Sequence, residues 1–280
     1  MPLDRKAALE LLAFYRDAGV DALLGDDPVN HFAGDAVELV TDPAIEPAAA
    51  ATVDRLPSSI RTTLPPKNSA AATRPSAVPP PDVAAMAARE AARNAGTLDE
   101  LRAILDAFEG CGLRKTAKQL VFADGNPKAR AMFVGEAPGA EEDRAGLPFV
   151  GRSGKLLDLM MAAIGLDRTT AYIANIIPWR PPGNRTPTPQ ESQICLPFIL
   201  RQIELANPDV LVCLGGPSAQ TILGFTDGIR RTRGHWLTFN TGTREIRAIA
   251  TFHPAYLLRA PLEKRLAWRD FLAIKQALAQ

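Results

Sequence analysis

The sequence lacks several features that would place it in a specialised class of protein. No apolar run approaches the ~18–20 residues of a membrane-spanning helix, and no secretory signal is recognisable at the start. Three cysteines at wide spacing do not make a disulfide framework, which favours a cytoplasmic setting. The formal net charge of +1 does not indicate a nucleic-acid partner, although binding depends on where charges lie rather than on their sum.

The 280 residues divide by composition into three parts. Residues 1–30 are expected to contain an amphipathic helix, since apolar residues such as Leu11 and Tyr15 recur at helical spacing. This helix either docks on the main domain or binds a protein partner that the sequence does not identify. Residues 31–83 are rich in Ala, Pro, Thr and Ser and predict a flexible linker, and residues 84–280 predict the folded domain.

Within the folded part, strand-like and helix-like segments alternate. Four short apolar runs predict buried strands, at 131–134, 171–177, 209–214 and 246–251. Such alternation is typical of an α/β fold, here a three-layer α/β/α sandwich with a central, mostly parallel four-stranded sheet. In sheets of this kind, the functional loops gather at the carboxyl ends of the strands.

The loops that follow these strands carry four conspicuous motifs. The first loop holds GEAPGAEED (135–143) and GLPFVGRSG (146–154), the second lies within YIANIIPWRPPGNRTP (172–187), and the last is FHPAYLLR (252–259). Glycines let the backbone approach a ligand closely, and free backbone amides can bind a carbonyl or an anion. Each motif alone would suit a structural turn, but four in order at strand ends are a strong signal.

Together the four motifs resemble the uracil-DNA glycosylase superfamily, and specifically its iron–sulfur-containing fourth family, over roughly residues 105 to 280. The resemblance implies a base excision repair enzyme that flips deoxyuridine out of DNA and hydrolyses its N-glycosidic bond, leaving an abasic site. Two alternatives stay open. One is a protein that binds uracil or abasic-site DNA with little turnover, and the other is a glycosylase for different deaminated bases, such as hypoxanthine or xanthine.

The resemblance also implies which residues hold the base. Phe149 is expected to stack on the uracil face, unless it is ordinary core. The Asn175 amide is expected to read the O4/N3 edge, where a donor and an acceptor together favour uracil over cytosine, unless it merely caps a turn. Gly135 and Ala137 complete the predicted substrate-binding set.

Two residues are predicted to be catalytic. His253 resembles the motif histidine that lies near uracil O2, where it would stabilise the negative charge on the departing base. Glu136 is expected to position or activate the attacking water, with Glu142 as the second candidate. A structural role for a histidine that precedes a proline is the alternative.

Further residues are expected to contact DNA. The end of the last motif resembles a segment that wedges into the base stack, although either of its leucines could instead be core. The basic segment 230–233 either faces phosphate or is a solvated run of charge. The predicted DNA-binding residues are Arg185, Arg233, Tyr256, Leu257, Leu258 and Arg259.

The cysteines depart from the fourth family, which holds its cluster with four of them. Cys111 and Cys195 match two of the positions, whereas Phe108 and Trp179 occupy the other two. Two thiolates cannot supply the usual four ligands, so we predict neither an iron–sulfur cluster nor another metal site, and aromatic packing in the vacated space. Cys213 lies in an apolar run, as expected of a small buried residue.

Other absences narrow the expected chemistry. The second loop has no histidine and no insertion, so covalent capture of DNA is not expected. No lysine stands in the four motifs, which argues against Schiff-base chemistry and strand cleavage and favours a monofunctional hydrolase. The expected partners are uracil-containing and abasic-site DNA, with no membrane, and the protein is expected to be a monomer.

Overall fold

The computed structural model describes residues 81–280, which belong to one compact unit. The helix predicted within 1–30 lies outside the described residues. So does the predicted linker, 31–83, except for its end, which falls in the helix α2 (Pro81–Arg93). None of the helices between residues 81 and 280 combines the length and the apolar character that crossing a bilayer demands.

A six-stranded sheet in the order β1-β3-β2-β4-β6-β5 forms the centre of this unit. Its strands are β1 (Ala123–Gly125), β2 (Ala131–Gly135), β3 (Ala171–Asn175), β4 (Val210–Leu214), β5 (Trp236–Asn240) and β6 (Glu245–Thr251). The four inner strands run parallel to one another, and the edge strands β1 and β5 pair antiparallel to their neighbours. The predicted parallel four-stranded sheet is therefore confirmed, and the structure adds an antiparallel strand at each edge.

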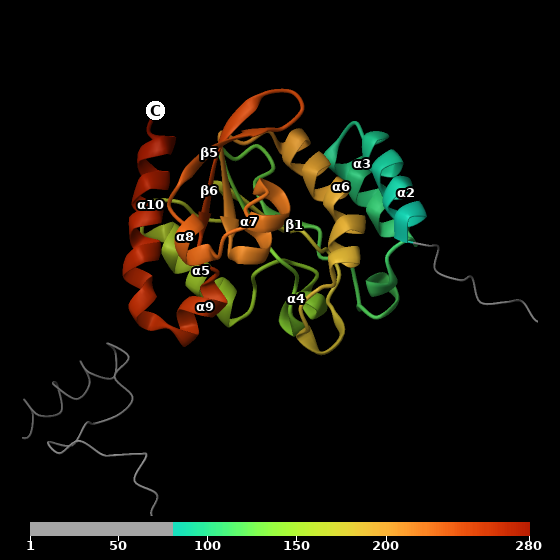
Figure 1. The fold of residues 1–280 in the computed structure, drawn as a ribbon, viewed down its shortest axis with the longest axis horizontal. Helices are drawn as coiled ribbons and strands as arrows, with labels where there is room; N and C mark the ends of the chain where they lie inside the picture. The colour runs from blue at the N-terminus through green and yellow to red at the C-terminus, as the bar shows by residue number, and fades with distance from the viewer. Residues whose placement is uncertain (1–80) are drawn as a thin grey trace, which may run out of the picture. The chain divides into compact units, whose positions relative to one another are not determined.

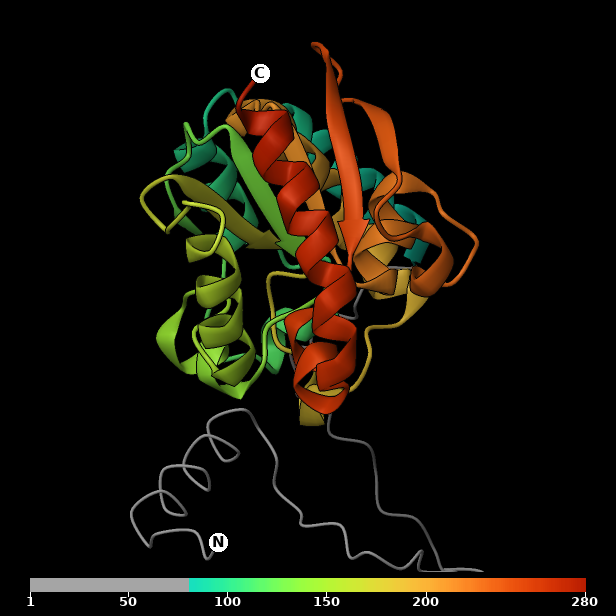
Figure 2. The ribbon, with the colours of Figure 1, turned by 90° about the vertical axis from the view of Figure 1, so that its left-hand side faces the viewer.

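Helices cover both faces of the sheet, as a three-layer sandwich requires. Figure 1 shows α10 and α5 on one side of the strands and α6, α3 and α2 on the other. Figure 2 shows α10 lying across the sheet. Beyond α2, the helices are α3 (Leu98–Ala107), α4 (Ala140–Ala145), α5 (Arg152–Ala162), α6 (Pro189–Ala206), α7 (Gly216–Leu223), α8 (Ile229–Thr232), α9 (Pro254–Arg259) and α10 (Lys264–Leu278), with short 3-10 turns η1 (Gly112–Lys115), η2 (Pro182–Asn184) and η3 (Pro261–Glu263).

The strand side chains alternate between two hydrophobic cores. In β2, Met132 joins the core beneath α2, α3, α6 and α7, and Phe133 joins the core beneath α5 and α10. The Phe133 ring stacks on Phe271 of α10, with ring centroids 6.0 Å apart. Strands β2, β3 and β4 are buried on both faces, which explains why they are continuous apolar runs in the sequence.

Helix α6 begins with a strong local signal. Thr188 accepts a hydrogen bond from the Glu191 amide, and the Glu191 carboxylate accepts one from the Thr188 amide, which makes a capping box. Pro189 occupies the first helical position, where the missing N–H carries no penalty. This cap fixes the point at which the loop after β3 gives way to helix.

Candidate active site

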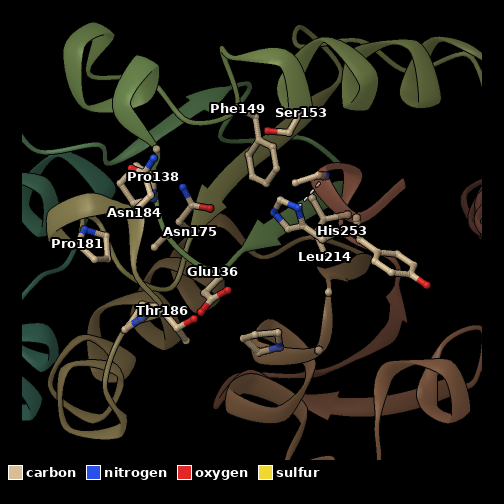
Figure 3. Close-up of a pocket in the computed structure, with 18 of the residues that line it drawn as sticks. Glu136, Pro138, Phe149, Ser153, Asn175, Pro181, Asn184, Thr186, Leu214 and His253 are labelled. Carbon is tan, nitrogen blue, oxygen red and sulfur yellow. Dashed lines mark hydrogen bonds between the residues drawn. The ribbon is translucent and has the colours of Figure 1, made fainter. Parts of the chain in front are cut away.

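A hollow of about 640 Å³ opens at the carboxyl ends of the four parallel strands. Each strand delivers a lining residue: Glu136 follows β2, Asn175 ends β3, Leu214 ends β4 and His253 follows β6. The loop 181–187 closes one side. Figure 3 shows Phe149, Asn175 and His253 around a shared space, with Glu136 at its border. The volume is within the range of small-molecule sites in proteins.

Asn175 brings an unsatisfied amide into this hollow. Its side chain is 4% exposed, and neither Nδ2 nor Oδ1 has a hydrogen-bond partner within the described part of the chain. Each unpaired buried polar group costs ~1–3 kcal/mol, so native proteins rarely leave one without a function. A ligand that offers an acceptor and a donor side by side would satisfy both atoms.

Phe149 lies beside His253 in an unusual backbone conformation. Its φ of 54° is in the left-handed region, which bulky side chains seldom adopt. The Phe149 carbonyl accepts a hydrogen bond from the Arg168 guanidinium, which also donates to the Pro148 carbonyl at 3.2 Å. The ring centroids of Phe149 and His253 are 5.5 Å apart. Arg168 thus fixes the strained turn that aims the ring into the hollow.

The missing side chain at Gly135 lets Phe149 and Asn175 come together. A Cβ at this position would lie 2.6 Å from Phe149 Cζ and nearer still to Asn175 Oδ1, distances that real Cβ atoms do not show. Ala137, two residues further on, also lines the hollow. Of the four residues predicted to bind the base, Ala137, Phe149 and Asn175 therefore line one cavity, and Gly135 lies against the last two.

The hydrogen bonding of His253 fixes its tautomer. His253 is the N-cap of α9, and its Nδ1 accepts a hydrogen bond of 3.1 Å from the Ala255 amide. Burial, together with the positive charge of Arg259, lowers the pKa of His253 to about 4. The imidazole is therefore neutral at pH 7 and carries its single proton on Nε2. It can donate that proton in a hydrogen bond but is a poor general acid.

Glu136 is the ionisable group at the border of the hollow. Burial raises the pKa of Glu136 above its ordinary value, because a carboxylate is less well solvated there than in water. The residue directly follows β2, and its carbonyl accepts a hydrogen bond from the Ile177 amide at 2.9 Å. A carboxylate with a raised pKa is suited to accept a proton from water.

Glu142, the second candidate for activating water, also lines the hollow, but its carboxylate is occupied by backbone amides. It is 7% exposed, and its carboxylate accepts hydrogen bonds from the amides of Gly139, Val150 and Gly151 at 2.9–3.1 Å. These bonds tie the start of α4 to the start of α5. The carboxylate therefore organises the loop that carries Phe149.

The family comparison decides what kind of protein has this site. Residues 122–272, more than half of the chain, match the family described as the uracil DNA glycosylase superfamily. The chain belongs to this superfamily. The resemblance seen in the four motifs is thereby confirmed.

Several relatives share the name Type-4 uracil-DNA glycosylase. The protein from Archaeoglobus fulgidus is 41% identical over 182 residues, which are 64% of this chain and 92% of the relative. The one from Thermotoga maritima is 45% identical over 153 residues, 53% of this chain and 77% of the relative. The one from Saccharolobus solfataricus is 37% identical over 190 residues, 65% of this chain and 88% of the relative.

In this member of the superfamily, four of the residues predicted to contact DNA lie at the border of the hollows. Arg259 lines the main hollow and a second one of about 450 Å³ next to it, which Leu258 also lines. Arg185 borders the main hollow and forms a bidentate ion pair with Glu191, at 2.6 and 2.8 Å. Tyr256 lines the same hollow, and its hydroxyl accepts a hydrogen bond from Arg230.

The other two residues predicted to contact DNA are less accessible, and their contact with DNA stays a prediction. Leu257 is 0% exposed and packs with Phe252 and Ala267, because it lies on the inner side of α9. Arg233 donates both Nε and Nη2 to the carboxylate of Asp270, whose side chain is 2% exposed. Leu257 is thus fully enclosed, whereas the Arg233 side chain keeps 14% of its surface exposed.

The structure adds residues that the sequence analysis did not select. Ser153 and Thr186 line the hollow and lie within the quoted motifs, so the sequence indicates that they are near the site. Leu214 and Gly215 belong to the fourth strand end, where a buried strand running into glycine was the available signal. The contact of Arg168 with Phe149 could not be predicted from the sequence, since the fold brings the two residues together across 19 positions.

The region that would hold an iron–sulfur cluster does not fit one. Cys111 and Cys195 are buried, with Sγ atoms 4.0 Å apart, but residues 81–280 contain no group of three or more metal-ligating side chains. The Phe108 ring packs edge-on against Phe198 with centroids 5.0 Å apart, and Trp179 is 2% exposed in the same core. Phe108 and Trp179, at which the resemblance implies the other two cluster ligands, thus carry aromatic side chains that pack in this core.

Proposed function

We propose that the protein is a uracil-DNA glycosylase that hydrolyses the N-glycosidic bond of deoxyuridine in DNA, releasing uracil and leaving an abasic site. The observation that carries this proposal is the buried, unpaired Asn175 amide beside Phe149 and His253. The relatives' names point to the same activity. The target base must leave the duplex to reach such a site, at a cost of a few kcal/mol.

Base recognition falls to Asn175 and Phe149. The amide Nδ2 donates to uracil O4, and Oδ1 accepts from N3–H, which satisfies both unpaired atoms at once. Cytosine has an amino group at position 4 and no proton on N3. The Nδ2 donor would then face another donor, and the Oδ1 acceptor would face another acceptor. The Phe149 ring supplies an apolar surface on which a flat base stacks.

Charge stabilisation falls to His253. As the glycosidic bond breaks, its electron pair moves onto uracil N1 and is shared with O2. The neutral imidazole donates its Nε2–H to O2, since Nδ1 is already occupied by the Ala255 amide. A fixed donor of this kind stabilises the developing anion without itself giving up a proton.

Water attack completes the reaction. Glu136 accepts a proton from water as the oxygen bonds to C1′ of the sugar, and the uracil anion is later protonated from solvent. The cavity lining contains no lysine, which matches simple hydrolysis without a Schiff base. The product is an abasic site in an uncut strand.

Residues at the border of the two hollows contact the DNA. Leu258 is 38% exposed and sits beside Arg259, so it can enter the stack while the guanidinium contacts phosphate. We assign Arg185 and Tyr256 to the same surface. No iron–sulfur cluster enters the proposal, because the two thiols and the surrounding aromatic side chains do not suit one.

The activity is tested on a labelled oligonucleotide with a single deoxyuridine, treated with alkali after incubation. Alkali-dependent cleavage at uracil, absent from a thymine strand and strongly reduced by His253→Ala, is the expected result. Cleavage without alkali would contradict the monofunctional mechanism. A gel shift on the uracil strand with no cleavage would replace the proposal with a binding protein, and faster release of hypoxanthine than of uracil would reassign the substrate.

A further inference from the structure

Two buried thiols lie close together away from the hollows. Cys111 directly precedes η1, and Cys195 is in the second turn of α6, separated by 84 positions in the sequence. Their Sγ atoms are 4.0 Å apart, and both side chains are 0% exposed. Neither residue lines either hollow.

We propose that Cys111 and Cys195 are a site of oxidative modification, at which a peroxide closes a reversible disulfide between η1 and α6. The Cys195 thiol already donates a hydrogen bond to Cys111 Sγ. A disulfide requires a sulfur–sulfur distance of ~2.05 Å, so each Sγ has to move by only ~1 Å, within reach of a side-chain rotation. The inference is independent of the proposed glycosylase activity.

The chemistry balances with peroxide as the oxidant. One sulfur attacks a peroxide oxygen, breaking the O–O bond to give a sulfenic acid and one molecule of water. The second sulfur then attacks the sulfenic sulfur, forming the S–S bond and releasing a second water. In total, two thiols lose two electrons and two protons, and hydrogen peroxide is reduced. A small dithiol reverses the reaction by exchange.

The surroundings hold both sulfurs in place. The Cys111 carbonyl accepts a hydrogen bond from the Arg114 amide in η1, and Cys195 is held within a capped helix. Phe108 packs on Phe198, one turn beyond Cys195. The missing side chain at Gly110 makes room for the Phe108 ring, since a Cβ there would lie 2.8 Å from Phe108 Cε1. A fixed partner at this distance favours the disulfide over further oxidation of one sulfur.

The expected effect is on stability rather than on the reaction. The cross-link closes a loop that contains β1, β2, α4, α5 and β3, and it therefore restricts the unfolded chain. We expect the oxidised protein to melt on the order of 5–10 °C above the reduced protein. The rate of uracil release should be the same in both forms, since no lining residue changes.

The test uses the full chain, reduced and then titrated with hydrogen peroxide. Each sample is denatured, alkylated and analysed by intact mass, peptide mapping and thermal melting. Cys213 is an internal reference, because it is a third buried thiol, placed in β4. Cys195→Ser removes one partner, and Cys213→Ala is the matched control.

The expected outcome is the loss of two hydrogen atoms, a peptide that joins Cys111 to Cys195, and a single alkylated cysteine, Cys213. Dithiothreitol should restore the reduced mass and melting temperature, Cys195→Ser should abolish the change, and Cys213→Ala should retain it. The peptide map of the unmutated chain decides the matter even if a variant folds poorly. Three alkylated cysteines at every dose, oxygen added to one sulfur alone, or stoichiometric iron lost in Cys195→Ser would each overturn the proposal.

Discussion

At the scale of single residues, Asn175 has an acidic counterpart of the same size. Asn175→Asp keeps the shape of the hollow but replaces the Nδ2 donor with an oxygen that faces uracil O4. We expect kcat/KM on deoxyuridine DNA to fall by about 100-fold or more, since the lost bond becomes a repulsion. Single-turnover excision measures the loss.

The matched control for this variant is Asn94→Asp. Asn94 is exposed and outside the cavity lining, so the same change of charge there should leave the rate within about 2-fold. Equal losses in both variants would remove Asn175 from base recognition.

The two ionisable residues of the site predict its pH dependence. His253, with a pKa of about 4, stays neutral throughout the range from pH 5 to 9, whereas the pKa of Glu136 is raised above its ordinary value. As the pH falls, Glu136 is protonated before His253. We therefore attribute the decrease in rate at acid pH to protonation of this carboxylate. Glu136→Gln should be slower and flat down to about pH 5, where only His253 remains to titrate.

Single-turnover rates of the unmutated chain and of Glu136→Gln across this range make the comparison. An unchanged acid limb in the variant would assign the titration to another group. Replacing His253 with Gln, in the same series, should lower the rate at every pH above 5 without moving the limb of Glu136.

At the scale of elements, the end of β2 depends on an absent side chain. Gly135→Ala would place a Cβ 2.6 Å from Phe149 Cζ, so the ring or the Asn175 amide has to move. We expect about a 10- to 100-fold lower rate of excision with the fold retained, because small misplacements cost much in an organised site. Gly228→Ala is the control, since nothing lies within 4 Å of a Cβ there.

The link between α8 and α10 is structural. Arg233 and Asp270 form a buried ion pair, and Asp270 also accepts a hydrogen bond from Thr251 Oγ1 at 2.7 Å. Removing one partner of such a pair costs about 3–5 kcal/mol. Arg233→Met should therefore lower the free energy of unfolding by that amount, measured by urea denaturation, with little change in DNA affinity of the folded protein.

The control for this variant is Arg231→Met, because the Arg231 side chain is 82% exposed. It should leave stability within about 0.5 kcal/mol. A large loss of DNA affinity in folded Arg233→Met, with stability intact, would return Arg233 to the DNA-binding surface.

Much of the fold was readable because its strongest signals are local. Apolar runs predict the four parallel strands, and the structure adds that Thr188 and Glu191, three positions apart, cap the start of α6. Strand β5 is harder to predict, since none of its five residues is buried, although the turn 240–243 is typical of a hairpin. The three residues of β1 carry no pattern of their own and depend on pairing with β3.

The site residues that lie in the motifs can be predicted from the sequence. Which of the neighbouring side chains are exposed cannot, because that depends on tertiary packing. Asn175 and His253 follow directly from the strand ends. Leu257 and Leu258 are adjacent and chemically alike, so only the docking of α9 decides which one is exposed. The ion pair of Arg233 cannot be predicted from the sequence, because its partner, Asp270, is 37 positions away.

At the scale of the molecule, the residues that we assign to the reaction all lie in the described part of the chain. The relative from Archaeoglobus fulgidus matches over 92% of its own length. We predict that residues 81–280 alone excise uracil at a rate within about 3-fold of the full chain. A folded fragment without activity, judged by circular dichroism and the oligonucleotide assay, would give the preceding residues a part in the reaction.

The aromatic packing around Phe108, Phe198 and Trp179 also has a nutritional consequence. A domain that binds no iron–sulfur cluster, as we propose, draws nothing from the cell's supply of iron for its helical layer. On that proposal, cells starved of the metal, or exposed to oxidants that destroy clusters, would keep this repair capacity while cluster-dependent enzymes lose theirs.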